Sequence, residues 1–134
     1  MELRFLYVGS DNTERDLTVW LAVPGARLRW RFDAFDSVVA AVDLGTGPLV
    51  LVADHRPAGS VLPIYAVADL DEATETLVAG GWTQHLGPLG TPEGPVTVLA
   101  DPSGTAVALL RVDRPGAMDH AYADDTNVHP RRAP

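Results

Sequence analysis

The chain repeats itself at an offset of 58 residues, and this repeat constrains the fold more than any other feature. The matching residues mark a strand, a helix start, a hairpin and an end in each half: Tyr7 with Tyr65, Asp11 with Asp69, Glu14 with Glu72, Thr18 with Thr76, Leu28 with Leu86, Asp43 with Asp101, Arg56 with Arg114, and Pro57 with Pro115. A period this long indicates two copies of one unit rather than an array. Two units without complete cores are expected to pack together or share sheets, with a ligand cleft between them.

Composition narrows the class of protein. A length of 134 residues and an apolar fraction of 46% fit one compact globular domain. The absence of cysteine excludes disulfides and thiolate chemistry. A net charge of −8 argues against nucleic acid as a partner. No apolar run reaches the ~20 residues that span a bilayer and no signal peptide is recognisable. We therefore expect a cytoplasmic protein that binds neither nucleic acid nor membrane.

The first half begins with a strand and a helix. Residues 3–8 are an apolar run typical of a strand. Ser10, Asp11 and Asn12 are residue types that cap helices, and Asp11 with Glu14 resembles a capping box, so Asp11 is the predicted cap. Leucine and tryptophan residues at helical spacing follow.

Three strands complete the first half after Pro24-Gly25 stops the helix. Residues 27–32 alternate arginine with apolar residues, which predicts a half-buried strand whose arginines lie in solvent or in surface ion pairs. Residues 38–44 and 49–53 predict two further strands, joined by a glycine-rich turn.

The second half follows the same plan. Residues 61–67 predict a strand, Asp69 caps the next helix with Glu72 three residues on, and Gly80-Gly81 ends that helix. The remaining predicted elements are a strand at 82–86, a Pro/Gly-rich connection at 87–95, and a hairpin of 96–100 with 105–112 across Asp101-Pro102-Ser103-Gly104.

The predicted class is therefore α+β, because each half reads as strand, helix and three strands. We expect a single domain over residues 1–116, with module one at 1–57 and module two at 60–116. Residues 117–134 are polar and predict a flexible tail, or a segment that only a neighbouring molecule orders.

These motifs resemble the vicinal oxygen chelate superfamily, the group of glyoxalases, bleomycin-resistance proteins and extradiol dioxygenases. The similar segments are Ala68-Asp69-Leu70-Asp71-Glu72-Ala73, then Gly80-Gly81-Trp82, and an aspartate-proline-x-glycine turn at Asp101-Pro102-Ser103-Gly104 that leads into a strand. The resemblance covers roughly residues 3–113. It implies two βαβββ modules forming a U-shaped mixed sheet around a cavity, and a homodimer. Trp20 stands where the family usually has tyrosine.

The resemblance also implies a metal site, whose ligands in the family are His, Gln or Glu on the first and last strands of each module. In module two those positions fall at Leu62 and Ala108. In module one the gapless offset gives Arg4 and Val50, and a one-residue slip gives Phe5 and Leu51. None of these side chains is a metal ligand of the family's kind. We therefore expect no metal and no cofactor.

Two histidines are candidates for a ligand site. His55 follows the last strand of module one and could hydrogen-bond a ligand, or be a polar linker residue. His85 alternates along its strand and could reach a cavity, or lie at the surface. A metal held by both histidines and a carboxylate is the remaining metal hypothesis.

Aromatic residues and one arginine complete the candidate site. Trp30, Phe32 and Phe35 cluster on or just after one strand and could stack on a planar ligand, and Tyr7 lies on the first strand. Arg4 could bind an anionic or carbonyl-bearing compound if the gapless offset holds, and faces solvent if it slips.

Two main functions stay open. The first is a metal-free protein that binds or sequesters a hydrophobic or aromatic molecule, as bacterial antibiotic-sequestering relatives do, with no catalytic residue. The alternative is a metal-dependent lyase, isomerase or dioxygenase of the same superfamily with displaced ligands. A protein–protein or assembly role is a third hypothesis.

Overall fold

The computed structural model describes residues 1–34 and 36–120. Eight strands and three helices follow one another along this part of the chain, in the order β1 (Glu2–Gly9), α1 (Thr13–Leu21), β2 (Arg27–Ala34), β3 (Ser37–Asp43), β4 (Leu49–Ala53), β5 (Val61–Ala66), α2 (Leu70–Ala79), β6 (Thr83–Gly90), β7 (Pro95–Ala100), β8 (Ala106–Leu110) and α3 (Ala117–His120). No helix among these residues is long and apolar enough to cross a bilayer.

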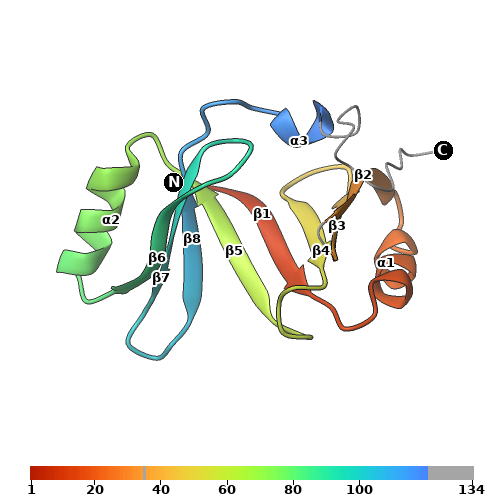
Figure 1. Cartoon of the computed structure of the whole chain (residues 1–134), viewed down its shortest axis with the longest axis horizontal. Helices are drawn as coiled ribbons and strands as arrows, with labels where there is room; N and C mark the ends of the chain where they lie inside the picture. Colours follow the sequence, from red (N-terminus) through yellow and green to blue (C-terminus); the bar gives the residue numbers. More distant parts are fainter. Residues whose placement is uncertain (35, 121–134) are drawn as a thin grey trace. The chain divides into compact units, whose positions relative to one another are not determined.

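The chain divides into two compact units (Figure 1). The first unit contains residues 5–61 and, at the end of the described chain, residues 118–120. The second unit contains residues 62–117 and the first four residues of the chain. Each unit carries one of the two βαβββ modules expected from the repeat.

Both units have the same strand order. The strands of the first unit run β1-β4-β3-β2 and those of the second run β5-β8-β7-β6. In each unit the first and last strands pair in parallel, as Tyr7 does with Leu51 and Tyr65 with Leu109. The other neighbours pair antiparallel. The sheet is therefore mixed, and the predicted α+β class with two βαβββ modules is confirmed.

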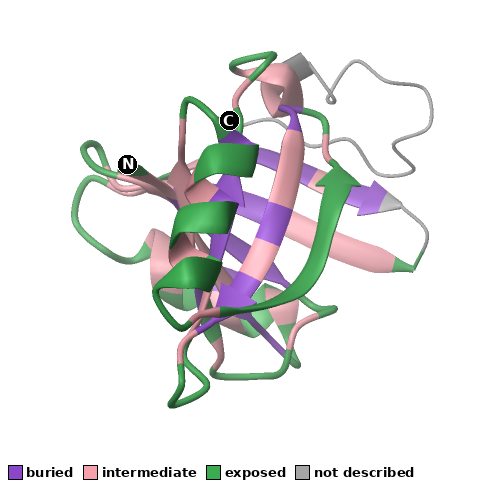
Figure 2. Cartoon of the chain, turned by 90° about the vertical axis from the view of Figure 1, so that its left-hand side faces the viewer, coloured by how far each residue is buried: buried purple, intermediate pink, exposed green. Residues whose placement is uncertain are grey.

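One helix covers one face of the sheet in each unit. In the first unit α1 packs on β3 and β4, where Leu17 contacts a core of valine and alanine that includes Val42 and Val50. In the second unit α2 packs on β6, β7 and β8, and its Leu70 contacts Leu99 and Leu109. The outer side of α2 is exposed (Figure 2). Because side chains alternate along a strand, the neighbours of these core residues point to the opposite face.

The helix ends are partly as expected. Asp69 caps α2 by accepting a hydrogen bond from Glu72 N at 3.0 Å, which confirms that prediction. In α1 the cap is Asn12, whose Oδ1 accepts from Arg15 N at 3.1 Å. The predicted cap Asp11 is therefore wrong; its carboxylate pairs with the Arg15 guanidinium at 2.8 Å instead.

The glycine pair ends α2 as predicted. Trp82 N donates to Leu77 O and Gly81 N donates to Val78 O, which is the hydrogen-bond pattern of a Schellman motif. Gly81 has a φ of +110°, a conformation that glycine adopts without steric cost.

Strand β2 departs from the predicted alternation, because its pairing with β3 shifts by one residue between Leu28 and Trp30. Leu28 and Arg31 therefore both lie on the face covered by α1. Arg31 is buried there, with Nε 2.8 Å from Asp33 Oδ1 and Nη1 2.6 Å from Glu14 Oε1. The expectation that all three arginines of this strand lie in solvent or in surface pairs is wrong for Arg31.

Two further boundaries differ from the sequence predictions. Strand β6 continues to Gly90 through residues expected to form a connection, and leaves a short turn at residues 91–94. The segment expected as a tail begins with the helical turn α3, and its residues 121–134 lie outside the described part of the chain.

Candidate functional site

The face of the first unit's sheet that points away from α1 holds several candidate residues. Pairing aligns Tyr7, Leu51, Ala41 and Trp30 in one row across β1, β4, β3 and β2. These residues alternate with the ones that contact α1, so they share the opposite face. Phe32 lies in the next row, paired with Val39.

The aromatic residues on this face differ in access. Trp30 is only 3% exposed, so it acts as packing within the described structure. Phe32 and Tyr7 are half-buried and leave part of each ring accessible. Phe35 lies outside the described residues. The accessible aromatic surface is therefore that of Tyr7 and Phe32.

The positions at which the resemblance implies metal ligands lie on the faces of the sheet that point away from the helices. They are Phe5, Leu51, Leu62 and Ala108. Val50 contacts α1, so the gapless offset is wrong and the slipped offset, with Phe5 and Leu51, is right. Leu62 and Ala108 alternate with residues that pack on α2. All four side chains are buried and apolar. None of these side chains offers an oxygen or imidazole donor, so neither pair, in its own unit, fits a divalent metal.

No other metal centre is formed by the residues that the structure describes, since no three His, Asp or Glu side chains gather in a suitable cluster among them. The hypothesis of a metal held by His55, His85 and a carboxylate therefore finds no support in this part of the chain. His85 is exposed on β6, an edge strand whose residues are all exposed (Figure 2).

Tyr7 and His55 form a polar pair in the first unit. The Tyr7 hydroxyl lies 2.9 Å from His55 Nε2, and the two rings meet edge to face with centroids 5.4 Å apart. Burial raises the pKa of Tyr7 to about 12, against the opposing effect of the Arg56 charge. The phenol is therefore neutral at physiological pH and can donate or accept one hydrogen bond.

The loop after β4 brings His55 to Tyr7 because it runs close to the end of β1. Gly9 N donates to Ser60 O at 2.9 Å, and Gly59 N donates to Gly9 O at 3.3 Å. A Cβ on Gly9 would lie 1.9 Å from Pro57 O. Gly9 is therefore required for this approach, a reason that the sequence alone does not show.

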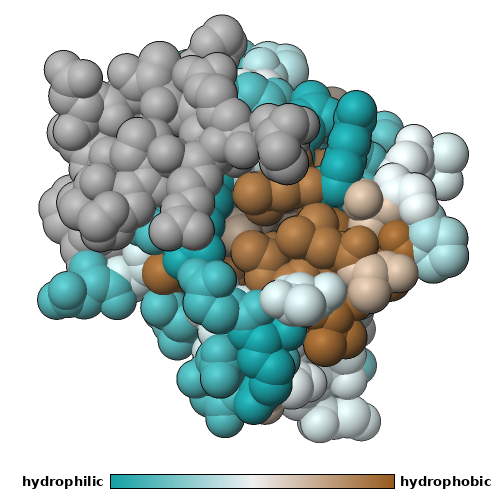
Figure 3. Space-filling view, turned by 90° about the vertical axis from the view of Figure 1, so that its right-hand side faces the viewer, coloured by the Kyte–Doolittle hydropathy of each residue, from teal (hydrophilic) through white to brown (hydrophobic). Residues whose placement is uncertain are grey.

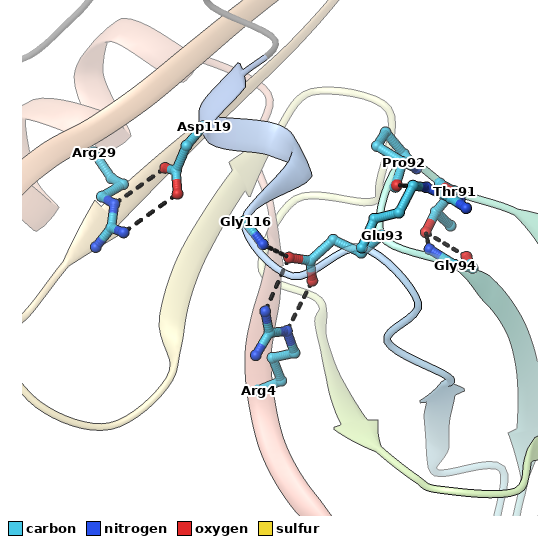
Figure 4. A network of polar contacts seen from close by, with 9 residues as sticks. Arg4, Arg29, Thr91, Pro92, Glu93, Gly94, Gly116 and Asp119 are labelled. Carbon is cyan, nitrogen blue, oxygen red and sulfur yellow. Dashed lines mark hydrogen bonds and ion pairs between the residues drawn. The ribbon is translucent and has the colours of Figure 1, made fainter.

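Arg4 has a different role from the one expected. Its Nε and Nη2 donate to the two carboxylate oxygens of Glu93 at 2.7 and 2.9 Å (Figure 4). Glu93 is 4% exposed and also accepts from Gly116 N at 2.9 Å. Arg4 thus ties the start of β1 into the second unit, and its guanidinium is already engaged by a carboxylate.

Arg56 and Glu93 are polar residues that sequence reasoning missed. Nothing in the sequence near Glu93 distinguishes it from a turn residue. The signal for Arg56 was present, because it matches Arg114 in the repeat. In the sequence, this match indicates only where each half of the chain ends.

Comparison with known proteins identifies the fold. The sequence matches no protein-family model and none of the curated proteins compared with it. Solved structures do match. A hypothetical protein, BH1468 from Bacillus halodurans C-125, aligns with a TM-score of 0.69 at 10% identity, covering 84% of this chain and 95% of that one.

Methylmalonyl-CoA epimerases are also similar in structure. The enzyme from Mycobacterium tuberculosis aligns with a TM-score of 0.69 at 13% identity, over 87% of this chain and 91% of that one. A methylmalonyl-CoA epimerase in complex with methylmalonyl-CoA and NH4+ aligns with a TM-score of 0.61 at 13% identity, over 84% and 94%. Identities this low establish a shared fold and leave the activity open.

Proposed function

We propose that this chain, which has the fold of the vicinal oxygen chelate superfamily, binds a hydrophobic or aromatic small molecule without a metal ion. One observation carries the proposal: Phe5, Leu51, Leu62 and Ala108 occupy the positions where the family would place metal ligands, and all four are apolar. A site without donor groups for a metal can still bind a small molecule through apolar area, stacking and a few hydrogen bonds.

The first unit supplies the groups for such binding. The half-buried rings of Tyr7 and Phe32 offer apolar surface, and the Tyr7–His55 pair offers a polar end. A ligand that packs on the ring surface and reaches the pair would satisfy both. Sequestration of an antibiotic or metabolite without any chemical change would be the biological outcome, with a homodimer as the expected assembly.

An enzyme is the second candidate, and the structural neighbours named as methylmalonyl-CoA epimerases favour it. A lyase, isomerase or dioxygenase would need its metal ligands displaced from the four apolar positions. His55 and His85 are candidate donors by residue type alone, because no metal-binding cluster forms among the residues that the structure describes.

An assembly role is the third candidate. On the side of the first unit that carries α1, Figure 3 shows an apolar area bordered by hydrophilic side chains. The exposed large apolar residues of this unit include Val19 and Val23, at and just after the end of α1. A protein partner would bind to exposed apolar surface of this kind.

Native mass spectrometry separates the first two candidates. Purified protein would be measured before and after treatment with a chelator, and then with planar antibiotics added. We expect a metal-free species that accepts a planar compound. A stoichiometric transition metal that the chelator removes would refute metal-free binding and favour the enzyme. The same spectra report whether the species is a dimer.

A further inference from the structure

Arg56 and Arg114 are equivalent in the repeat, but their guanidinium groups differ. Each precedes a proline shortly after the last strand of its unit. Arg114 Nε donates to Pro92 O at 2.8 Å, and its Nη2 donates to Thr91 O at 3.2 Å. Arg56 Nε is buried, and no residue in the described part of the chain accepts a hydrogen bond from it.

A buried N–H without an acceptor is rare in folded proteins and calls for a specific explanation. Arg56 also has no carboxylate within ion-pair distance among the described residues, although the protein is strongly acidic. The neighbouring Asp54 carboxylate accepts from Val38 N at 3.0 Å. Within the described part of the chain, the charge of Arg56 therefore has no carboxylate partner, and its Nε has no acceptor.

Arg56 directly follows His55, which belongs to the polar pair of the first unit. Its positive charge lowers the pKa of Tyr7, against the larger effect of burial. The Tyr7 hydroxyl is hydrogen-bonded to His55 Nε2 at 2.9 Å. A phenol and an imidazole thus meet at the end of β1 and the loop after β4, and the guanidinium belongs to the next residue of the same loop.

We propose that Arg56, together with Tyr7 and His55, binds the anionic oxygen of an aromatic or hydrophobic ligand, such as a carboxylate or phenolate. This inference rests on the proposed binding function and adds the charge of the ligand to it. The role first considered for Arg4 falls to Arg56, because Glu93 already occupies the Arg4 guanidinium. Guanidinium and carboxylate are complementary, and Arg56 is a half-buried residue, so a ligand carboxylate would pair with the charge of the guanidinium rather than with the covered Nε.

Two probes of equal shape test this inference. Isothermal titration calorimetry would measure binding of 2-naphthoate, which carries a carboxylate, and of 2-naphthamide, its neutral counterpart. We expect the naphthoate to bind at least about tenfold more tightly. Arg56→Gln should abolish this preference and leave naphthamide binding within about twofold of the original.

Control variants keep the test specific. Arg27→Gln removes the same charge from an arginine of the same unit whose side chain is 72% exposed, and should leave the preference intact. Arg56→Lys keeps the positive charge but lacks the planar guanidinium, so this variant should retain only part of the preference for naphthoate. Thermal unfolding of each variant checks that it is folded before titration.

The possible outcomes are distinct. If both probes bind but Arg56→Gln keeps the naphthoate preference, the inference is refuted while the binding function stands. If both probes bind equally to the unmodified protein, the anion preference is likewise refuted. If neither probe nor other planar compounds bind, the proposed function itself falls, and the inference with it.

Discussion

The two units have the same strand order and the same helix position, but their tyrosines lie on opposite faces. Tyr65 packs with the core under α2, whereas its repeat partner Tyr7 lies on the face away from α1 and bonds His55. Arg114 is fixed by backbone carbonyls, whereas Arg56 Nε has no acceptor in the described structure. The repeat thus preserves the framework, and the candidate chemistry lies where the copies differ.

The largest expected difference between the units concerns two Arg–Asp pairs of equal spacing. In the first unit Arg31 and Asp33 join Nε to Oδ1 at 2.8 Å, with side chains 8% and 10% exposed. In the second unit Arg111 and Asp113 are joined at 2.9 Å, with 47% and 34% exposed. Arg31→Met should lower the free energy of unfolding by about 3–5 kcal/mol, because it removes a guanidinium from a buried carboxylate.

Urea unfolding of both variants measures this difference. Arg111→Met serves as the matched control and should leave the midpoint almost unchanged, because water screens an exposed pair. Equal effects of the two substitutions would show that burial does not distinguish the pairs. The double variant Arg31→Met with Asp33→Asn should recover part of the lost free energy of unfolding, because the second change removes the charge of the buried carboxylate.

Two glycines, one at the end of β1 and one at the end of β6, provide the second test. Gly9→Ala places a Cβ 1.9 Å from Pro57 O, whereas Gly90→Ala in β6 meets no atom within 4 Å. We expect Gly9→Ala to destabilise the protein by about 1–3 kcal/mol, as overpacking does. Gly90→Ala should stay within about 0.5 kcal/mol of the original. Thermal unfolding measures both, and a tolerated Gly9→Ala would show that the loop after β4 is free to move.

The sequence predicted the framework well because its signals are local. The Asp101 turn is an example: Asp101 Oδ1 accepts from Ser103 N and Thr105 N, both at 2.9 Å. Its repeat partner Asp43 accepts from Gly45 N at 2.7 Å in the same manner. A short-range hydrogen bond of this kind is encoded by neighbouring residues, so the 58-residue offset locates it correctly.

The candidate site was harder to predict because it depends on contacts between distant segments. Tyr7 and His55 are far apart in sequence, and only the parallel pairing of β1 with β4 brings them together. The shift in β2 likewise depends on its partner strand, so the arginine–apolar alternation placed Arg31 on the wrong face. The gapless offset assigned Arg4 in place of Phe5 for another reason: it matches Tyr7 with Tyr65, although Tyr65 packs with the core under α2 and Tyr7 lies on the face away from α1.

The third prediction concerns how the stability of the protein depends on pH through Tyr7 of the first unit. Its pKa is raised by burial to about 12, from about 10 in an unfolded chain. Between these values the unfolded state has lost the phenol proton and the folded state has kept it. The unfolded state therefore binds fewer protons, and stability falls as pH rises through this interval.

Urea unfolding at several alkaline pH values tests this effect. Tyr7→Phe removes the phenol and should make the decline in stability shallower between pH 10 and about 12. Tyr65→Phe, the equivalent change in the second unit, leaves the Tyr7 phenol in place as a matched control. An unchanged decline in Tyr7→Phe would contradict the burial of that hydroxyl.

The smallest expected effect distinguishes the helix caps of the two units. Asn12 and Asp69 each accept a hydrogen bond from the backbone N–H three residues on, so Asn12→Ala and Asp69→Ala should each cost about 1 kcal/mol. Asp11→Ala removes only an exposed partner of Arg15 and should change stability much less. Chemical unfolding of the three variants would measure this order. If Asp11→Ala lowered the free energy of unfolding as much as Asn12→Ala, Asp11 would be the cap of α1 after all. The gapless repeat would then hold at this helix, because it matches Asp11 with Asp69.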